Sequence, residues 1–172
     1  MHMNVEGLQV SLRPMVMADV DQVMAIEQVA FPTPWPRDAF VYELTRNRNA
    51  VCWVAEMTIG DEDPLVVGST IIWLGPEGAH VGTLAVHPDC RQRRIGQSLL
   101  AKALIESAKR GADQATLEVR VSNTPAQALY RKLGFEPVGQ QKNYYTDTSE
   151  DAIIMLLSPI NDLSLAKCVI HQ

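Results

Sequence analysis

Apolar and polar residues follow one another along the chain in two patterns, one typical of strands and one typical of helices. Alternating or short continuous apolar runs predict strands at residues 8–13, 50–58, 65–74, 79–86, 115–121, 135–144 and 152–157. Apolar residues at helical spacing predict helices at residues 19–30, 37–47, 95–110 and 125–134. This order predicts a mixed α/β, α+β-like domain, because it lacks the strict alternation of a doubly wound sheet.

The ends of these elements carry local signals that agree with the patterns. The polar segment at residues 60–64 (GDEDP) separates two apolar runs, which we expect to pair as a hairpin. Gly111 is expected to cap the C-terminal end of the third helix. Asn123 is expected to cap the N-terminal end of the fourth helix, with Pro125 in its first turn.

Composition narrows the classes of function. The 172 residues suit one domain, and 47% apolar and 20% charged residues are ordinary for a globular protein. The net charge of -5 argues against a nucleic-acid partner, and no apolar run is long enough to predict a membrane partner. Three widely spaced cysteines without metal-ligand spacing predict free thiols, no bound metal and a reducing compartment. Because no signal-peptide pattern is present, we expect the cytoplasm.

The segment LAVHPDCRQRRIGQSLL is the most informative part of the chain. A predicted strand leads into the basic loop Arg91–Gly96, and the loop opens a predicted helix. The free N–H groups at a helix start bind phosphate readily, and Arg91 and Arg93 add positive charge. Taken alone, the segment is also compatible with a solvated basic loop before an ordinary helix. The glycine-rich patterns of dinucleotide dehydrogenases and of nucleoside triphosphatases are absent from the sequence.

This loop resembles the coenzyme A loop of the GCN5-related N-acetyltransferase (GNAT) family. The family pattern is Gln or Arg, two residues, Gly, one residue, and Gly or Ala; LAVHPD before the loop and LYRKLGF after it also match. One departure is that Arg94 stands where the family has its first glycine. The resemblance implies a GNAT domain at residues 1–158 with a C-terminal tail at 159–172. It also implies a central, mostly antiparallel twisted sheet of about seven strands flanked by about four helices.

Acetyl-CoA is the cosubstrate that the resemblance implies. In the family, the pantetheine arm lies along the strand before the loop like an added strand, which maps to the backbone of Leu84, Ala85 and Val86. Including the loop and a downstream asparagine and tyrosine, the implied coenzyme-binding residues are Leu84, Ala85, Val86, Arg91, Gln92, Arg93, Arg94, Ile95, Gly96, Gln97, Asn123 and Tyr130.

The segments LEVRVSNTPAQALYRKLGF and NYYTDTSEDAIIM resemble the RimI branch of the family, the ribosomal-protein-alanine N-acetyltransferases. The resemblance implies that Glu118 is the general base, Tyr130 the general acid and Asn123 a coenzyme contact. From the pattern alone, Glu118 is equally well explained as a polar residue on a solvated strand face, paired with Arg120. Tyr130 on its own is equally well explained as a helix residue that packs in the core.

Aromatic residues on two segments are candidates for the acceptor side. Tyr144 and Tyr145 are expected in a loop between the last two strands, where N-terminal acetyltransferases close over a peptide terminus; an aromatic pair at a strand end is the plainer interpretation. Trp35 lies in AFPTPWPRDAF, whose prolines predict a stiff link between the first two helices. The RimI branch has a similar segment beside its acceptor groove, so Trp35 either lines that groove or is buried in a rigid turn.

The resulting hypothesis is direct acetyl transfer from acetyl-CoA to the N-terminal α-amine of a protein, with the N-terminal Ala of a small-subunit ribosomal protein as the implied substrate and partner. Cys90 lies near the loop, but we do not expect it to act as a nucleophile. Two alternatives stay open: an acetyltransferase for a protein lysine or a small amine, and a non-catalytic acyl-CoA-binding sensor. The sequence does not predict the oligomeric state.

Overall fold

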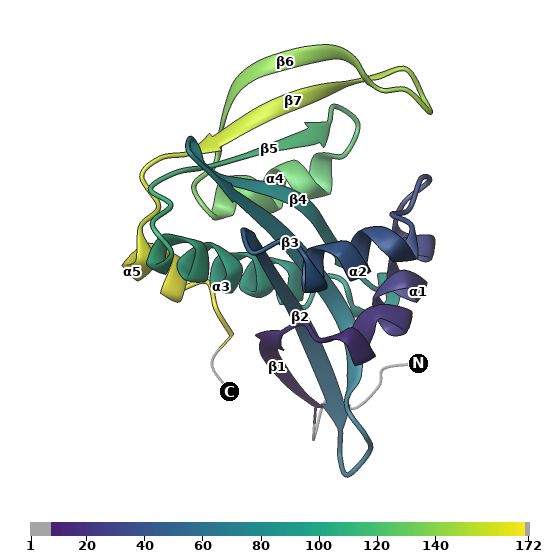
Figure 1. Ribbon diagram of the computed structural model, residues 1–172. Helices are drawn as coiled ribbons and strands as arrows, with labels where there is room; N and C mark the ends of the chain where they lie inside the picture. Colours follow the sequence, from purple (N-terminus) through teal and green to yellow (C-terminus); the bar gives the residue numbers. More distant parts are fainter. Residues whose placement is uncertain (1–7, 171–172) are drawn as a thin grey trace.

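One seven-stranded sheet with the strand order β1-β2-β3-β4-β5-β7-β6 runs through the protein, whose computed structural model describes residues 8–170 (Figure 1). The strands are β1 (Leu8–Pro14), β2 (Ala50–Ile59), β3 (Leu65–Gly75), β4 (Gly78–Val86), β5 (Ala115–Arg120), β6 (Glu136–Tyr145) and β7 (Glu150–Leu157). All neighbours pair antiparallel except β4 and β5, which pair parallel. The predicted mixed α/β fold and its mostly antiparallel sheet are confirmed.

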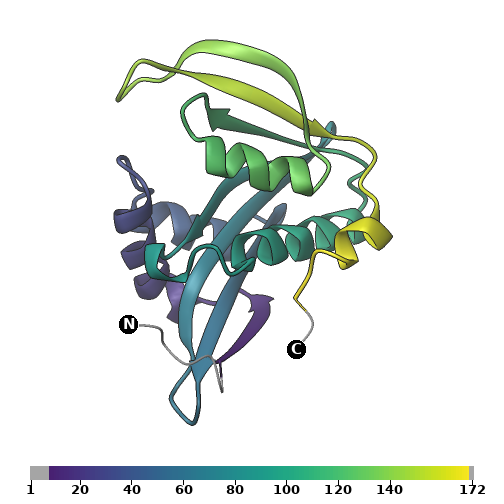
Figure 2. The same ribbon diagram turned by 180° about the vertical axis from the view of Figure 1, so that it is seen from behind.

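Helices cover both faces of this sheet (Figures 1 and 2). The helices are α1 (Val20–Ala30), α2 (Arg37–Thr45), α3 (Ile95–Lys109), α4 (Thr124–Lys132) and α5 (Asp162–Ala166), with short 3-10 turns at Met17–Asp19 and Pro88–Cys90. Helices α1 and α2 lie on one face, while α3 and α4 lie on the other. The four predicted helices are confirmed, and the short helix α5 was not predicted.

The apolar patterns that predicted the elements are the faces that the fold buries. On β5, Ala115, Leu117 and Val119 are buried, whereas the residues between them are half-exposed. On α3, all five apolar residues that predicted the helix are buried: Ile95, Leu99, Leu100, Ala103 and Leu104. Full burial of a large aliphatic side chain stabilises a fold by about 1.5–3 kcal/mol, so this helix face alone anchors α3 firmly on the sheet.

Strands β4 and β5 separate soon after they meet, and this fork positions the site. Their pairing is limited to Ala79 with Ala115 and His80 with Thr116. Just beyond, Gly82 has no partner in β3, because Val81 pairs with Ile72 while the next paired residue is one position further along β4. Such a bulge bends and twists a strand. It therefore turns β4 away from β5 and leaves one edge of β4 open, as Figure 1 shows.

Two segments differ from the sequence prediction. Tyr144 and Tyr145 are the last residues of β6 and do not lie in a loop, because β6 extends to Tyr145 and the connection to β7 is short. In the C-terminal segment, Leu165 of α5 is buried against α3, and the hydroxyl of Ser98 donates to the carbonyl of Cys168 at 3.1 Å. The division of the chain at residue 158 stays a prediction.

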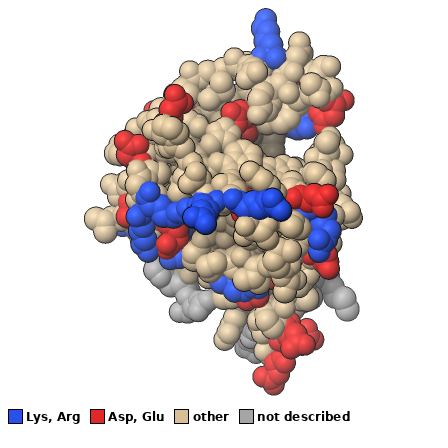
Figure 3. All heavy atoms as spheres, viewed as in Figure 1, with Lys and Arg blue, Asp and Glu red and all other residues tan. Residues whose placement is uncertain are grey.

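Lys and Arg side chains form a band across the side of the molecule that is seen in Figure 1 (Figure 3). Several basic residues of α3 and its C-terminal end have partners within the protein. Lys102 and Lys109 both pair with Glu106 at 2.9 Å, and Arg110 donates to the carbonyl of Ala50 at 2.9 Å. The two Glu106 pairs lie within α3, and the Arg110 contact attaches the end of this helix to the start of β2. No helix within residues 8–170 has the length and apolar character needed to cross a membrane.

Candidate active site

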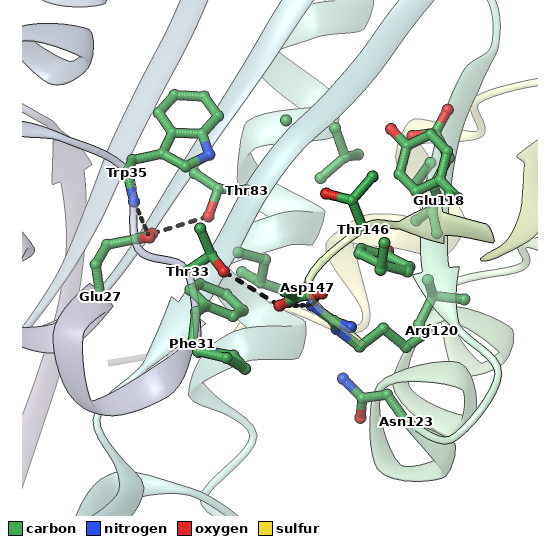
Figure 4. A pocket seen from close by; sticks show the side chains of 18 of the residues that line it. Glu27, Phe31, Thr33, Trp35, Thr83, Glu118, Arg120, Asn123, Thr146 and Asp147 are labelled. Atoms are coloured by element: carbon green, nitrogen blue, oxygen red, sulfur yellow. Dashed lines mark hydrogen bonds and ion pairs between the residues drawn. The ribbon is translucent and has the colours of Figure 1, made fainter. Parts of the chain in front are cut away.

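A cavity of ≈ 500 Å³ occupies the fork between β4 and β5 (Figure 4). Its wall comes from the end of α1 and the link to α2, from β4, from β5 with the start of α4, and from the end of β6. The lining residues are Glu27, Phe31, Pro32, Thr33, Trp35, Val81, Gly82, Thr83, Leu84, Leu117, Glu118, Val119, Arg120, Asn123, Tyr130, Tyr144, Tyr145, Thr146 and Asp147. The fold thus brings Trp35, Leu84, Glu118, Asn123, Tyr130, Tyr144 and Tyr145, all predicted site residues, to one cavity.

Glu118 extends from β5 into the cavity at the open end of the fork. Alternation along β5 places it on the half-exposed face, as predicted. Its Oε2 lies 3.0 Å from Nε2 of His80 on β4, and Nδ1 of the same ring lies 3.1 Å from Oγ1 of Thr116. The alternative that paired Glu118 with Arg120 is wrong, because Arg120 contacts Asp147 instead. The carboxylate of Glu118 is held at the cavity by an imidazole.

Tyr130 and Asn123 approach the cavity from α4. Asn123 caps this helix, accepting from the N–H of Ala126 at 3.2 Å, as predicted. Its Oδ1 is used by the cap, so its amide N–H groups remain to face a ligand. Tyr130 packs edge-on against Phe135 with ring centroids 6.0 Å apart. Burial first, and then the neighbouring Tyr145, raise the pKa of Tyr130, so its hydroxyl stays protonated at neutral pH and can donate a proton.

The basic loop bends into α3 through two residues with left-handed backbone conformation. Gln92 has φ 61° and Arg94 has φ 62°. For Arg94 this conformation costs about 1–2 kcal/mol, and glycine adopts it freely, which explains the glycine of the family pattern. The side chain of Arg94 is exposed and points to solvent. Arg94 occupies the N-cap position of α3 without a side-chain cap, so the first N–H groups of α3 are available to an anion.

Gly96 has a packing role that the sequence did not reveal. A Cβ at this position would lie 3.3 Å from Leu129 of α4 and 3.3 Å from Val86 of β4. The absence of a side chain therefore lets α3, α4 and β4 approach each other closely. In the structure, two apolar side chains fill the space.

The open edge of β4 fits an extended ligand. Leu84, Ala85 and Val86 pair with β3 on one side, and beyond His80 no strand within residues 8–170 pairs with the other side of β4. Unpaired strand edges bind extended chains through their backbone groups. One of these groups has a partner, because Nε of Arg91 donates to the carbonyl of Val86 at 3.2 Å.

On the opposite side of the cavity, a hydrogen-bonded bridge joins β5, the β6–β7 turn and the α1–α2 link (Figure 4). Arg120 contacts Asp147 at 2.9 Å, and Asp147 accepts from the hydroxyl of Thr33 at 3.1 Å. The guanidinium of Arg120 also lies 4.0 Å from the ring centre of Tyr145. Arg120 lowers the pKa of Asp147, which keeps this carboxylate charged. Tyr144 stands edge-on to Tyr145, with ring centroids 5.0 Å apart.

Burial and charge also set the state of the two tyrosines. Burial, followed by the negative charge of Glu118, raises the pKa of Tyr144. The pKa of Tyr145 rises to about 12, again mainly through burial. Both hydroxyls therefore stay protonated at neutral pH.

Glu27 is a cavity residue that the sequence analysis did not identify. It accepts from the hydroxyl of Thr83 at 2.9 Å and from the N–H of Trp35 at 3.4 Å. Burial raises the pKa of this carboxyl group. A signal was present, because Glu27 follows Val20 and Val23 at helical spacing and so falls on the apolar face of α1. No sequence pattern marks His80 as a site residue, because the residues that it contacts lie on other strands.

The thiols of Cys52 and Cys90 are poorly suited to act as nucleophiles. Burial raises the pKa of Cys52 to about 12 and also raises that of Cys90, which disfavours the thiolate that a cysteine nucleophile needs. In the part of the chain that the structure describes, no three His, Cys, Asp or Glu side chains gather in a way that would hold a metal ion.

Comparison with known proteins places these features in a family. The model of the "Acetyltransferase (GNAT) family" matches residues 20–135, which is more than half of the chain. A protein of Bacillus subtilis (strain 168) is 39% identical over 145 residues, covering 84% of this chain and 93% of the relative. The [ribosomal protein bS18]-alanine N-acetyltransferase of Escherichia coli (strain K12) is 33% identical over 150 residues, covering 81% of this chain and 90% of the relative.

Solved structures agree with the sequence comparison. The crystal structure of the ribosomal-protein-S18-alanine N-acetyltransferase from Escherichia coli superimposes with a TM-score of 0.76 at 31% identity, over 89% of this chain and 95% of that chain. Arabidopsis thaliana NAA60 in complex with acetyl-CoA has the same fold, with a TM-score of 0.75 at 19% identity over 87% of this chain and 98% of that chain.

Proposed function

The chain belongs to the GNAT family of acetyltransferases, and we propose that it acetylates the N-terminal α-amine of a protein whose first residue is Ala. Membership makes it an N-acetyltransferase that uses acetyl-CoA. The proposed acceptor is the N-terminal Ala of ribosomal protein bS18 or of a protein with a similar terminus. The observation that carries this choice is the 33% identity to the bS18-alanine N-acetyltransferase of Escherichia coli over 90% of that enzyme.

The donor side of the cavity has the features that acetyl-CoA requires. Its phosphates would meet the uncapped start of α3 and the positive charges of Arg91 and Arg93. The pantetheine arm would add to the open edge of β4. Asn123, whose amide N–H groups are left over from its cap, would contact the coenzyme. Bound there, acetyl-CoA supplies an activated acetyl group as a thioester.

Glu118 and Tyr130 are the proposed acid–base pair. An incoming ammonium group has to lose a proton before its nitrogen can attack, and Glu118 accepts that proton directly or through water. An α-amine, with an ordinary pKa near ~7.7–8.0, gives up this proton more readily than a lysine, near ~10.4. The nitrogen then attacks the carbonyl carbon of the thioester, the carbon–sulfur bond breaks, and the new amide nitrogen loses its extra proton to solvent. Tyr130, whose raised pKa keeps its hydroxyl protonated until this step, donates its proton to the departing thiolate.

The acceptor side suits a slim peptide terminus. Tyr144, Tyr145 and Trp35 line the cavity, and the bridge through Asp147 closes it toward the α1–α2 link. A backbone amine enters such an aromatic-lined space more easily than a long lysine side chain does. The cavity therefore favours an N-terminal amine over a lysine side chain.

Steady-state kinetics with matched peptides test the proposal. Both peptides have the same sequence, which starts with Ala and contains one internal lysine. The N-terminus is free in the first peptide and blocked in the control. We expect acetylation of the free peptide and none of the blocked one.

The Glu118→Gln and Tyr130→Phe variants should each reduce kcat by roughly 10²-fold or more with the free peptide. Faster acetylation of the blocked peptide would refute the N-terminal acceptor, and unchanged kcat in both variants would refute the assigned roles. Tight acetyl-CoA binding without acetylation of any peptide would instead indicate a sensor.

A further inference from the structure

We propose that His80 is a positioning residue that holds the carboxylate of Glu118 in the orientation needed to accept a proton. This inference rests on the proposed role of Glu118 as general base. It does not require His80 to touch either substrate. It starts from the place of His80 at the last paired position of β4 and β5, opposite Thr116.

The two hydrogen bonds of the imidazole determine what His80 can do. An ionised carboxylate only accepts hydrogen bonds, so the nitrogen 3.0 Å from Oε2 of Glu118, which is Nε2, has to carry a hydrogen. In the neutral ring Nδ1 is then an acceptor, and the hydroxyl of Thr116 at 3.1 Å supplies the donor. This arrangement occupies one oxygen of the Glu118 carboxylate and leaves Oε1 for the amine.

A stack of aromatic rings holds the imidazole in place. The rings of His80 and Trp73 are nearly parallel, with centroids 5.9 Å apart and an angle of 8° between their planes. The rings of Trp73 and Trp35 have centroids 5.6 Å apart and an angle of 12° between their planes. These separations fall in the range of favourable offset stacking. The stack runs from the α1–α2 link across β3 to β4, and it ends at the ring that contacts Glu118.

Gly82 makes room for this stack. A Cβ on Gly82 would lie 3.0 Å from Cη2 of Trp73 and 3.1 Å from both Cζ2 and Cζ3, closer than side chains normally approach. Gly82 is also the unpaired residue of the β4 bulge, so the same position opens the fork and accommodates the indole. His80 is held by the stacked ring of Trp73, by the hydroxyl of Thr116 and by its paired position in β4.

If His80 acts only through Glu118, its variants should change kcat and leave the KM for acetyl-CoA nearly constant. In His80→Phe the stacked ring remains and both hydrogen bonds are lost, and we expect kcat to fall roughly 10- to 100-fold because the carboxylate is misplaced. The KM for acetyl-CoA should change less than about twofold, since the coenzyme loop is untouched. His80→Gln keeps an N–H donor and should recover part of the lost kcat.

The decisive measurement is a double-mutant cycle with Glu118→Gln. If His80 works through Glu118, adding His80→Phe to Glu118→Gln should change kcat by less than about twofold. Equal losses in both backgrounds, or wild-type kcat in His80→Phe alone, would overturn the inference while leaving Glu118 as base. Wild-type kcat in Glu118→Gln alone would remove the proposed base and the inference with it. Should His80→Phe fail to fold, Thr116→Val removes the hydroxyl donor only and should give a smaller loss that also vanishes in the Glu118→Gln background.

Discussion

The two sides of the cavity are built in different ways. The proposed donor side starts at the open edge of β4 and continues beyond the cavity lining to the basic loop and the start of α3, and it would offer mainly backbone N–H groups from one continuous segment. The acceptor side consists of side chains from four segments, held by the bridge of Thr33, Asp147 and Arg120. A site made of local backbone can bind the same coenzyme in every member of a family. A site made of distant side chains can change its acceptor without disturbing the coenzyme.

Tyr130 lies where the two sides meet, and its removal is expected to have the largest effect. Tyr130→Phe keeps the ring packed against Phe135 and removes only the hydroxyl. We expect kcat to fall roughly 10²-fold with both KM values nearly unchanged, because the proton for the leaving thiolate is lost. Since burial raises the pKa of Tyr130, kcat in the wild type should also show no loss from ionisation of this tyrosine between neutral pH and about pH 10. If Tyr130→Phe kept the full kcat, a group other than Tyr130 would be the general acid.

Asp147 tests whether the acceptor side is separate from the donor side. Asp147→Asn weakens the contacts to Arg120 and Thr33, and we expect the KM for the peptide to rise by about fivefold or less, as is typical for an exposed charged pair. The KM for acetyl-CoA should stay constant. Because Arg120 lowers the pKa of Asp147, the bridge should persist at mildly acidic pH and be lost only as the pH falls through that lowered value. An equal rise in both KM values would contradict the division into two sides.

Arg94 tests the donor side. Arg94→Gly removes the left-handed strain at φ 62°, so the free energy of unfolding should rise by about 1 kcal/mol, or roughly 2–4 °C in Tm for a chain of this length. Thermal unfolding without ligand measures this. An Arg94→Ala control keeps the strain and removes the guanidinium. If the KM for acetyl-CoA rises equally in both variants while only the glycine variant is stabilised, Arg94 contacts the coenzyme as well as bending the loop.

Glu27 provides the smallest expected effect, a change in how stability depends on pH. Burial raises the pKa of Glu27 in the folded protein, so over the window between its unfolded and folded values the folded state binds more protons than the unfolded state. This contribution to stability is therefore fully present at low pH and decreases as the pH rises through the folded value. In urea unfolding from about pH 4 to pH 7, the free energy of unfolding of the wild type should fall relative to that of Glu27→Gln. Parallel curves for the two proteins would contradict the raised pKa.

Much of the fold and half of the site follow from the sequence alone. Periodicity placed all seven strands and the four longer helices, because the buried face of an element repeats at the spacing of its own backbone. The sequence also predicted the basic loop, the helix cap by Asn123 and the position of Glu118 on the half-exposed face of β5, for a similar reason. Each depends on residues that are close in the chain.

Tertiary structure alone decided the rest. The fork depends on a bulge at Gly82 and on pairing that stops at His80, and neither has a local signal beyond one glycine. The partner of Glu118 proved to be His80 and not the nearby Arg120, because residues 38 positions apart in sequence meet across two parallel strands. Contacts of this kind arise only when the whole sheet has formed. The sequence therefore determined the elements and the chemistry that they carry, and the packing of those elements determined which groups act together.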